Sequence, residues 1–508
     1  MKKFVSILLI MCSSLVMSAQ QRSLTDSIHY RAEMQATLSD GDHTPLWLNA
    51  NKYGLSSLKT ANGYLRESIE RPLSADDNRK WGIGYGADIA VAAGFTSTVI
   101  LQQAYVEGRW LKGTLTVGAK EYPMELKNQE LSTGSQTLGI NARPVPQVRL
   151  ALPEYWTIPG TNNWLALKGH IAYGKTTDDN WQKDFVGPNL RYTENTLYHS
   201  KAGYLKIGPK RITLELGAEM ACQFGGKSYY YSGEDLQVYK NSSGFKALWQ
   251  ALIPGGSDAT DGDYQNASGN HLGSWVARLN FDYPKWNLGL YADHFFEDAS
   301  GMFLLGYNGY GSGEQWNSKE SSRYFLYDMK DCLLGAELKL KNVDWLSNLV
   351  IEYMYTKYQS GPVYHDHTQT ISDHLCGRDN YYNHNLYTGW QHWGMVMGNP
   401  LYMSPLYNHD GRIEIMNNRF VAWHIGLSGS PVRQLHYRVL ATWQKGYGTY
   451  YHLFDNPRET VSLLAEVDYC LPKGWRIKAA FGTDSGKLYG NNYGAQFTIA
   501  KTGLLKLK

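Results

Sequence analysis

The segment 377–407 gathers side chains suited to binding a soluble ligand, because it combines flat aromatic rings with amides and a cation. Ring faces suit the C–H groups of sugars, while Arg and amide groups bind hydroxyls or uronate carboxylates. The residues expected to contact a glycan are Arg378, Tyr381, Tyr382, Tyr387, Trp390 and Trp393. An alternative stays open, in which the same rings form the core of a folded loop that acts as a cap.

Two other groups of side chains could carry catalysis or bind a metal, and the sequence favours neither. Glu215 with Glu219, and Glu466 with Asp468, could act in glycoside hydrolysis, but only a pair two residues apart in a strand reaches the workable separation of roughly 7 Å. Lining of a polar interior explains both pairs. The histidines within 365–392 match no zinc motif, neither His-Glu-x-x-His nor paired Cys-x-x-Cys units. We therefore expect no enzyme, no metal and no cofactor.

The elements that must position these residues are strands with one apolar and one polar face. In 28–38 the even-numbered residues are Ile, Tyr, Ala, Met, Ala and Leu, whereas the odd-numbered ones are His, Arg, Glu, Gln and Thr. Because successive side chains of a strand point to opposite faces, one whole face must meet an apolar medium. The same pattern recurs in 81–91, 211–223, 274–283, 435–444 and 461–469.

The number and length of such segments predict an all-β fold, a transmembrane antiparallel β-barrel of about 18 strands with long extracellular loops. Trp and Tyr stand at several strand ends, as in the aromatic girdles of membrane barrels. Short connections such as 208–210 and 284–285 alternate with long ones at about 175–196, 224–270, 297–320 and 359–419. A soluble sandwich does not explain this asymmetry or the charges in mid-strand.

Within a barrel, the apolar faces would contact outer-membrane lipid and the polar faces would line the lumen. The residues expected to line the lumen are Arg31, Glu33, Arg211, Glu215, Glu219 and Arg278. These charges fit either a water-filled channel or a salt-bridged, occluded interior. A general or solute-specific diffusion porin therefore stays open as an alternative function.

The N-terminal segment and the bulk composition fit an exported protein. Residues 1–19 have the layout of a cleaved signal peptide, with two lysines, an apolar run and small residues up to Ala19. The remainder, 20–508, is expected to form a single barrel domain. The net charge of +3 suggests no nucleic-acid partner. The cysteines after Ala19 are widely spaced, which predicts free thiols rather than a disulfide framework.

Two regions resemble the Wzi-type capsule assembly family. The first is STGSQTLGINARPVPQVRL at 132–150, followed by PEY at 153–155 and LKGHIAYG at 167–174. The second is DNYYN at 379–383, followed by YTGW at 387–390 and GNPL at 398–401. The resemblance implies a barrel of the bacterial outer membrane that binds capsular or other surface polysaccharide and helps attach or assemble it. It implies a lectin rather than an enzyme, with the capsule export machinery as a further partner.

Overall fold

The computed structural model describes residues 24–253, 269–297, 309–310, 313–315, 318–320, 330–364 and 375–505. The expected signal peptide, 1–19, lies outside these residues. Parts of the expected loops 224–270, 297–320 and 359–419, with the histidines of 365–374, lie outside them as well. No helix within the described residues is long and apolar enough to cross a membrane.

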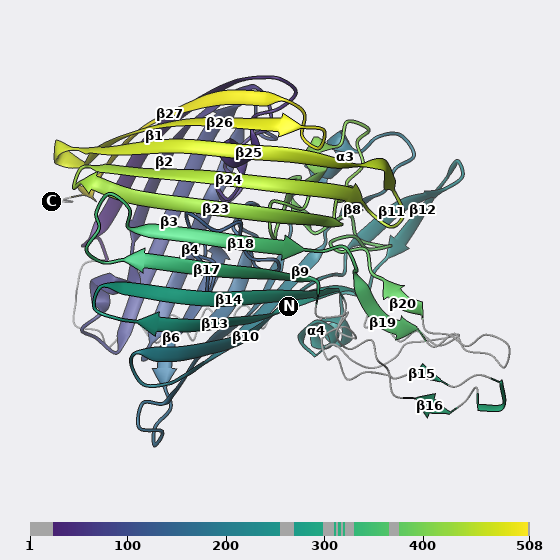
Figure 1. Ribbon diagram of the computed structural model, residues 1–508, viewed down its shortest axis with the longest axis horizontal. Helices are drawn as coiled ribbons and strands as arrows, with labels where there is room; N and C mark the ends of the chain where they lie inside the picture. Colours follow the sequence, from purple (N-terminus) through teal and green to yellow (C-terminus); the bar gives the residue numbers. More distant parts are fainter. Residues whose placement is uncertain are drawn as a thin grey trace.

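The strands form one closed, 18-stranded antiparallel barrel, in which neighbours follow chain order and β27 pairs back with β1 (Figure 1). This confirms the expected fold class and the expected number of strands. The barrel strands are β1 (Ile28–Asp40), β2 (Ala61–Arg71), β3 (Trp81–Ala93), β4 (Val99–Trp110), β5 (Gly113–Ala119), β6 (Gln147–Thr157), β7 (Leu165–Lys175), β9 (Leu197–Ile207), β10 (Ile212–Phe224), β13 (Asn270–Asp282), β14 (Trp286–Glu297), β17 (Cys332–Leu340), β18 (Asn348–Tyr355), β23 (Phe420–Val432), β24 (Leu435–Gly448), β25 (Leu453–Leu471), β26 (Trp475–Gly486) and β27 (Asn492–Leu505).

The side chains of the barrel wall are distributed inside out relative to a soluble protein. On β1, Glu33 and Thr37 are buried, whereas Met34 and Leu38 are 48% and 70% exposed. The same inversion holds around the ring, because many large apolar side chains of the strands are exposed while their polar neighbours are buried. An apolar outer face around a polar interior is typical of a transmembrane barrel.

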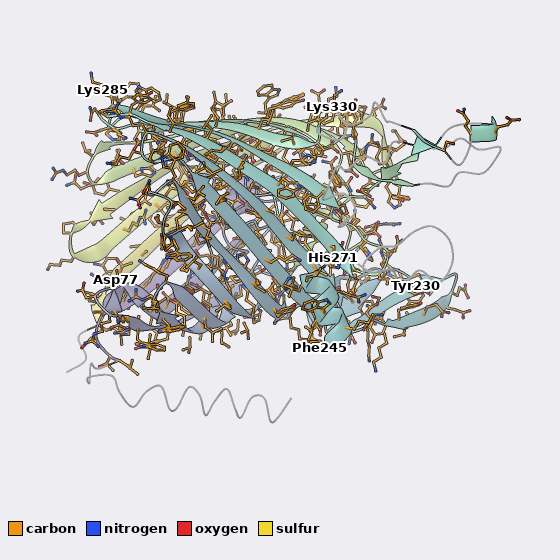
Figure 2. The ribbon with its side chains drawn as sticks, turned by 90° about the horizontal axis from the view of Figure 1, so that it is seen from below. Asp77, Tyr230, Phe245, His271, Lys285 and Lys330 are labelled. Atoms are coloured by element: carbon orange, nitrogen blue, oxygen red, sulfur yellow. The ribbon has the colours of Figure 1, made fainter. Side chains whose placement is uncertain are left out.

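The two rims of the barrel differ in the length of their connections. One rim, the short-turn rim, carries tight turns such as 208–211 and 283–285, and the ends of β1 and β27 meet there. The opposite, long-loop rim carries the long connections. In Figure 2, Asp77 and Lys285 of two short turns lie at one end, and Tyr230 lies at the other.

The long connections contain short elements of their own at the long-loop rim (Figure 1). The helices are α2 (Leu46–Asn49), α3 (Asp179–Phe185) and α4 (Phe245–Leu252), with 3-10 turns at Gly313–Gln315 and Pro405–Tyr407. Two further 3-10 turns, Leu73–Asp76 and Pro472–Gly474, lie in connections of the short-turn rim. Small sheets pair β8 (Tyr192–Glu194) with β11 (Lys227–Ser232) and β12 (Asp235–Lys240), β15 (Gly309–Tyr310) with β16 (Lys319–Glu320), β19 (Ser360–Tyr364) with β20 (Leu375–Arg378), and β21 (Gln391–His392) with β22 (Met395–Val396).

Candidate functional site

Three connections fold back into the barrel and fill much of its interior. We call residues 41–60, 120–146 and 379–418 the plug. Their buried apolar side chains form one cluster with inward-facing residues of the wall, among them Tyr198 of β9 and Ala480 of β26. Because β9 and β26 lie on opposite sides of the ring of strands, this cluster crosses the barrel from wall to wall.

A buried ion pair fixes the second plug segment to the wall. Lys127 Nζ lies 2.6 Å from Asp293 Oδ2 on β14, and both side chains are almost fully buried. The backbone N–H of Gln136 donates to the same carboxylate at 3.1 Å. Burial alone would lower the pKa of Lys127, but the carboxylates of Asp293 and Glu219 raise it above its ordinary value. The plug thus supplies the counter-charge that a buried wall carboxylate needs.

Further hydrogen bonds from the plug satisfy acidic side chains of other strands. Asn128 Nδ2 donates to Glu337 of β17 at 2.8 Å, and the same carboxylate pairs with Arg278 of β13 at 2.6 Å. On β18, Glu352 accepts the backbone N–H of Thr133 at 2.7 Å. These contacts spread over several strands, so the plug is anchored along an arc of the wall.

The structure places most of the expected lumen-lining residues inside the barrel, where they form hydrogen bonds or ion pairs with other side chains. Glu33, Glu215 and Glu219 are buried and accept hydrogen bonds from tyrosine hydroxyls at 2.6–2.8 Å, and Arg278 is buried beside Glu337. Arg31 is half-buried and pairs with Glu33. Arg211 differs, because β10 begins at Ile212; it lies in the β9–β10 turn and is exposed.

The aromatic residues of the third plug segment are packed in its core. Tyr381, Tyr382, Tyr387 and Trp390 are at most 2% exposed. The Tyr381 hydroxyl donates to Asp331 at 3.0 Å, the Tyr382 hydroxyl to the Gln136 carbonyl and Trp390 Nε1 to the Thr137 carbonyl at 3.4 Å. This burial favours the alternative in which the rings build a cap. Arg378 ends β20, and glycan contact by these five residues stays a prediction.

Trp393 is the expected glycan-binding residue whose ring reaches the surface. It is half-buried at the long-loop rim, and its Nε1 donates to Thr177 Oγ1 at 3.3 Å. The guanidinium of Arg143 lies 4.5 Å from the ring centroid and is held by Thr96 and Ser97 at 2.7 and 2.9 Å. Burial lowers the pKa of Arg143 to about 10, so it stays cationic near neutral pH.

This pair can offer a sugar a partly exposed aromatic ring that a buried cation holds in place. The sequence patterns single out Trp393 but not Arg143. Arg143 lies within the first region that resembles the capsule assembly family, yet nothing in that stretch indicates which ring it meets. The two residues are far apart in the chain and are brought together only when both plug segments enter the barrel.

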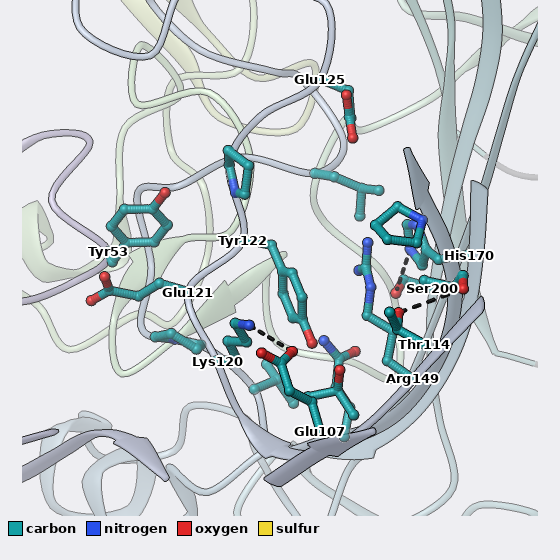
Figure 3. Close-up of a pocket in the computed structure, with 18 of the residues that line it drawn as sticks. Tyr53, Glu107, Thr114, Lys120, Glu121, Tyr122, Glu125, Arg149, His170 and Ser200 are labelled. Atoms are coloured by element: carbon teal, nitrogen blue, oxygen red, sulfur yellow. Dashed lines mark hydrogen bonds and ion pairs between the residues drawn. The ribbon is translucent and has the colours of Figure 1, made fainter. Parts of the chain in front are cut away.

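A cavity of about 450 Å³ lies between the plug and one side of the wall (Figure 3). Strands β2, β4 to β7, β9 and β10 line it together with plug residues within 120–125 and 137–145. In it, Lys120 pairs with Glu107 of β4 at 2.6 Å, and the guanidinium of Arg149 lies 4.0 Å from the ring centroid of Tyr122. Strand alternation predicts that Glu107 and Arg149 point inward, but the cavity itself depends on the path of the plug.

Comparison with known proteins adds a family and a related fold. The family model of the capsule assembly protein Wzi matches residues 48–313. Among solved structures, Wzi of Escherichia coli, described as an outer membrane protein involved in group 1 capsule assembly and a carbohydrate-binding β-barrel, has a TM-score of 0.56 and 13% identity, over 94% of this chain and 85% of that one. At this identity the likeness shows a shared fold.

Two further structures have lower scores, and both come from Pseudomonas aeruginosa. OprD has a TM-score of 0.44 and 9% identity, over 94% of this chain and 96% of its own. OccK5 (OpdH) has a TM-score of 0.45 and 8% identity, over 95% of this chain and 99% of its own. Among curated proteins, none matches this sequence.

Proposed function

Because this chain belongs to the capsule assembly protein Wzi family, we propose that it is an outer-membrane barrel that binds capsular or other surface polysaccharide and helps attach or assemble it. In this role it acts as a lectin without catalysis. Its outer face contacts membrane lipid, and the capsule export machinery is a further partner. The short-turn rim faces the periplasm and the long-loop rim faces outward, as in other outer-membrane barrels.

The observation that carries the proposal is the packed plug. A diffusion porin needs a water-filled lumen between its rims. Here a continuous buried cluster joins opposite walls, and buried charges such as Asp293 and Glu337 are paired with cations of the plug or of the wall. Such a barrel is suited to presenting a folded binding surface at the long-loop rim rather than to the diffusion of solutes through its lumen.

The contact with polysaccharide is proposed at the Trp393–Arg143 pair. A sugar ring can lie against the part of the Trp393 ring that reaches the surface. The buried Arg143 guanidinium lies against this ring and orients it for the sugar. The pair is held in place before the ligand arrives, because Thr96, Ser97 and Thr177 bind its polar groups. Such preorganisation lowers the entropic cost of binding.

Replacing Trp393 by alanine is expected to weaken binding of isolated surface polysaccharide by roughly tenfold, since a contact of a partly exposed aromatic ring contributes on the order of 1.4 kcal/mol. The measurement is titration of the purified, detergent-solubilised chain with polysaccharide from the producing strain. The matched control is Trp81→Ala, which removes an exposed ring at the start of β3 near the short-turn rim.

Both variants should keep the heat-modifiable gel mobility of a folded barrel, so that a change in binding reports the site alone. Equal binding by Trp393→Ala and the wild type would remove this residue from the proposal. A loss of binding in Trp81→Ala would show that the assay responds to the barrel wall instead of the rim.

A further inference from the structure

The cavity is reached from the short-turn rim, whereas the Trp393 ring lies at the long-loop rim. Its lining includes Leu73, in the turn between β2 and β3, and the exposed Glu154 near the end of β6. At its other end it meets the plug at Ala142 and Met397. It is therefore a pocket that ends against the plug and faces the periplasmic side of the barrel.

Six carboxylates line the cavity, and three of them pair with cations of the protein: Glu107 with Lys120, Glu121 with Arg66, and Glu125 with Lys168. Of the others, Glu70 and Glu219 accept hydrogen bonds from tyrosine hydroxyls, and Glu154 is exposed at the short-turn rim. Burial raises the pKa of Glu121 above its ordinary value, and Arg66 acts in the opposite direction. An anionic ligand would thus meet three carboxylates whose charge is already compensated by cations.

Arg149 differs from these residues. Among the described residues, no hydrogen bond or ion pair engages its guanidinium, although the side chain lines the cavity and is half-buried. Its flat face rests on the Tyr122 ring at 4.0 Å, which fixes the orientation of the group. In Figure 3, Arg149, Tyr122 and His170 border the same space.

An arginine with free donors, held by an aromatic ring inside a cavity, is matched to a carboxylate, which it can bind through two parallel hydrogen bonds. The rings of Tyr122, Tyr198 and Tyr204 line the same cavity and offer apolar surface beside the donor. On the neighbouring strands β7 and β9, His170 Nε2 and Ser200 Oγ lie 3.3 Å apart and can turn toward hydroxyl groups.

We propose that this cavity binds a carboxylate-bearing sugar unit from the periplasmic side, with Arg149 holding the carboxylate and the tyrosine rings facing the sugar. The volume of about 450 Å³ falls within the range of roughly 300–1,000 Å³ that small-ligand sites span. Arg143 lies at the plug end of this cavity, but Trp393 does not line it, so the site is distinct from the sugar contact proposed on the Trp393 ring and does not depend on it. It would let the barrel engage acidic glycan on its inner side as well.

The test is titration of the purified full chain in detergent with D-glucuronate and, as the matched neutral probe, D-glucose. Glucuronate is expected to bind at least about tenfold more tightly than glucose, because a charged hydrogen bond pair contributes roughly 1.5–3 kcal/mol. Arg149→Gln should abolish this preference. Ala151→Phe, which keeps Arg149 but fills the cavity beside it, should weaken the binding of both sugars.

The matched control is Arg476→Gln, because Arg476 lies near the short-turn rim with its Nε donating to Asp468 at 2.6 Å. Its substitution should leave the preference for glucuronate unchanged. If Arg149→Gln does not fold into a heat-modifiable barrel, the binding of the two sugars by Ala151→Phe decides the test. Equal binding of the two sugars by the wild type, or unchanged glucuronate binding in the variants, would overturn the proposal. Neither result changes the outcome expected for the titration of Trp393→Ala with polysaccharide. Each proposal can therefore be contradicted without the other.

Discussion

Trp390→Ala is expected to lower the free energy of unfolding of the plug by about 3–5 kcal/mol, as for other large-to-small changes in packed cores. The Trp390 side chain is fully buried and stacks on Tyr198 of β9 with ring centroids 5.9 Å apart. Its Nε1 donates to the Thr137 carbonyl of the neighbouring plug segment. Removing it leaves a cavity where two plug segments meet the wall, so the plug should open before the barrel does.

Two measurements detect the opening of the plug in Trp390→Ala. Near-ultraviolet circular dichroism during urea unfolding should show the plug transition at lower urea than in the wild type. In planar bilayers the wild type should give no large steady current, while the variant should give intermittent openings. Trp345→Ala is the control, because Trp345 lies in the β17–β18 turn and is 64% exposed. A large steady current through the wild type would contradict the packed interior and favour the porin.

Lys127→Met is expected to destabilise the plug by about 3–5 kcal/mol, because the change leaves the Asp293 carboxylate buried without its counter-charge. The double variant Lys127→Met with Asp293→Leu should regain most of that loss, since a buried ion pair is often replaceable by apolar side chains. The same urea titration provides the measurement, arranged as a double-mutant cycle.

The surface pair Lys445–Glu459, with a distance of 2.7 Å, supplies the control for this cycle. Lys445→Met should change the unfolding midpoint little, because water and salt screen exposed charges. If Lys127→Met behaved like Lys445→Met, the plug would not depend on its buried ion pair. The anchoring of residues 120–146 described above would then be incorrect.

The barrel could be predicted from the sequence because a two-residue period of apolar and polar side chains indicates directly that one face of each strand contacts an apolar medium. The alternating segment 28–38 corresponds to β1, and the segment 211–223 corresponds to β10 with a shift of one residue. That shift matters at Arg211, which the pattern assigned to the lumen and the structure places in a turn. Strand ends depend on turn geometry, which the period of two does not contain.

The plug could not be predicted, because whether a loop folds inward is decided by partners far away in the chain. Residues 120–146 carry no strand or helix period, and their inward path depends on contacts such as Lys127 with Asp293. His392 shows the same dependence, since its Nδ1 meets the Arg143 carbonyl at 2.8 Å. Tyrosine and tryptophan suit both sugar binding and core packing, so residue type alone left both alternatives open for 377–407.

The most direct test of the proposed function compares cell-attached and shed polysaccharide in a strain that lacks this chain. Loss of the chain should move surface polysaccharide from the cells into the medium without changing the total amount made. Complementation with the wild type should restore attachment, and complementation with Trp393→Ala should restore it only in part. The same fractions of attached and shed polysaccharide with and without the chain would contradict the account.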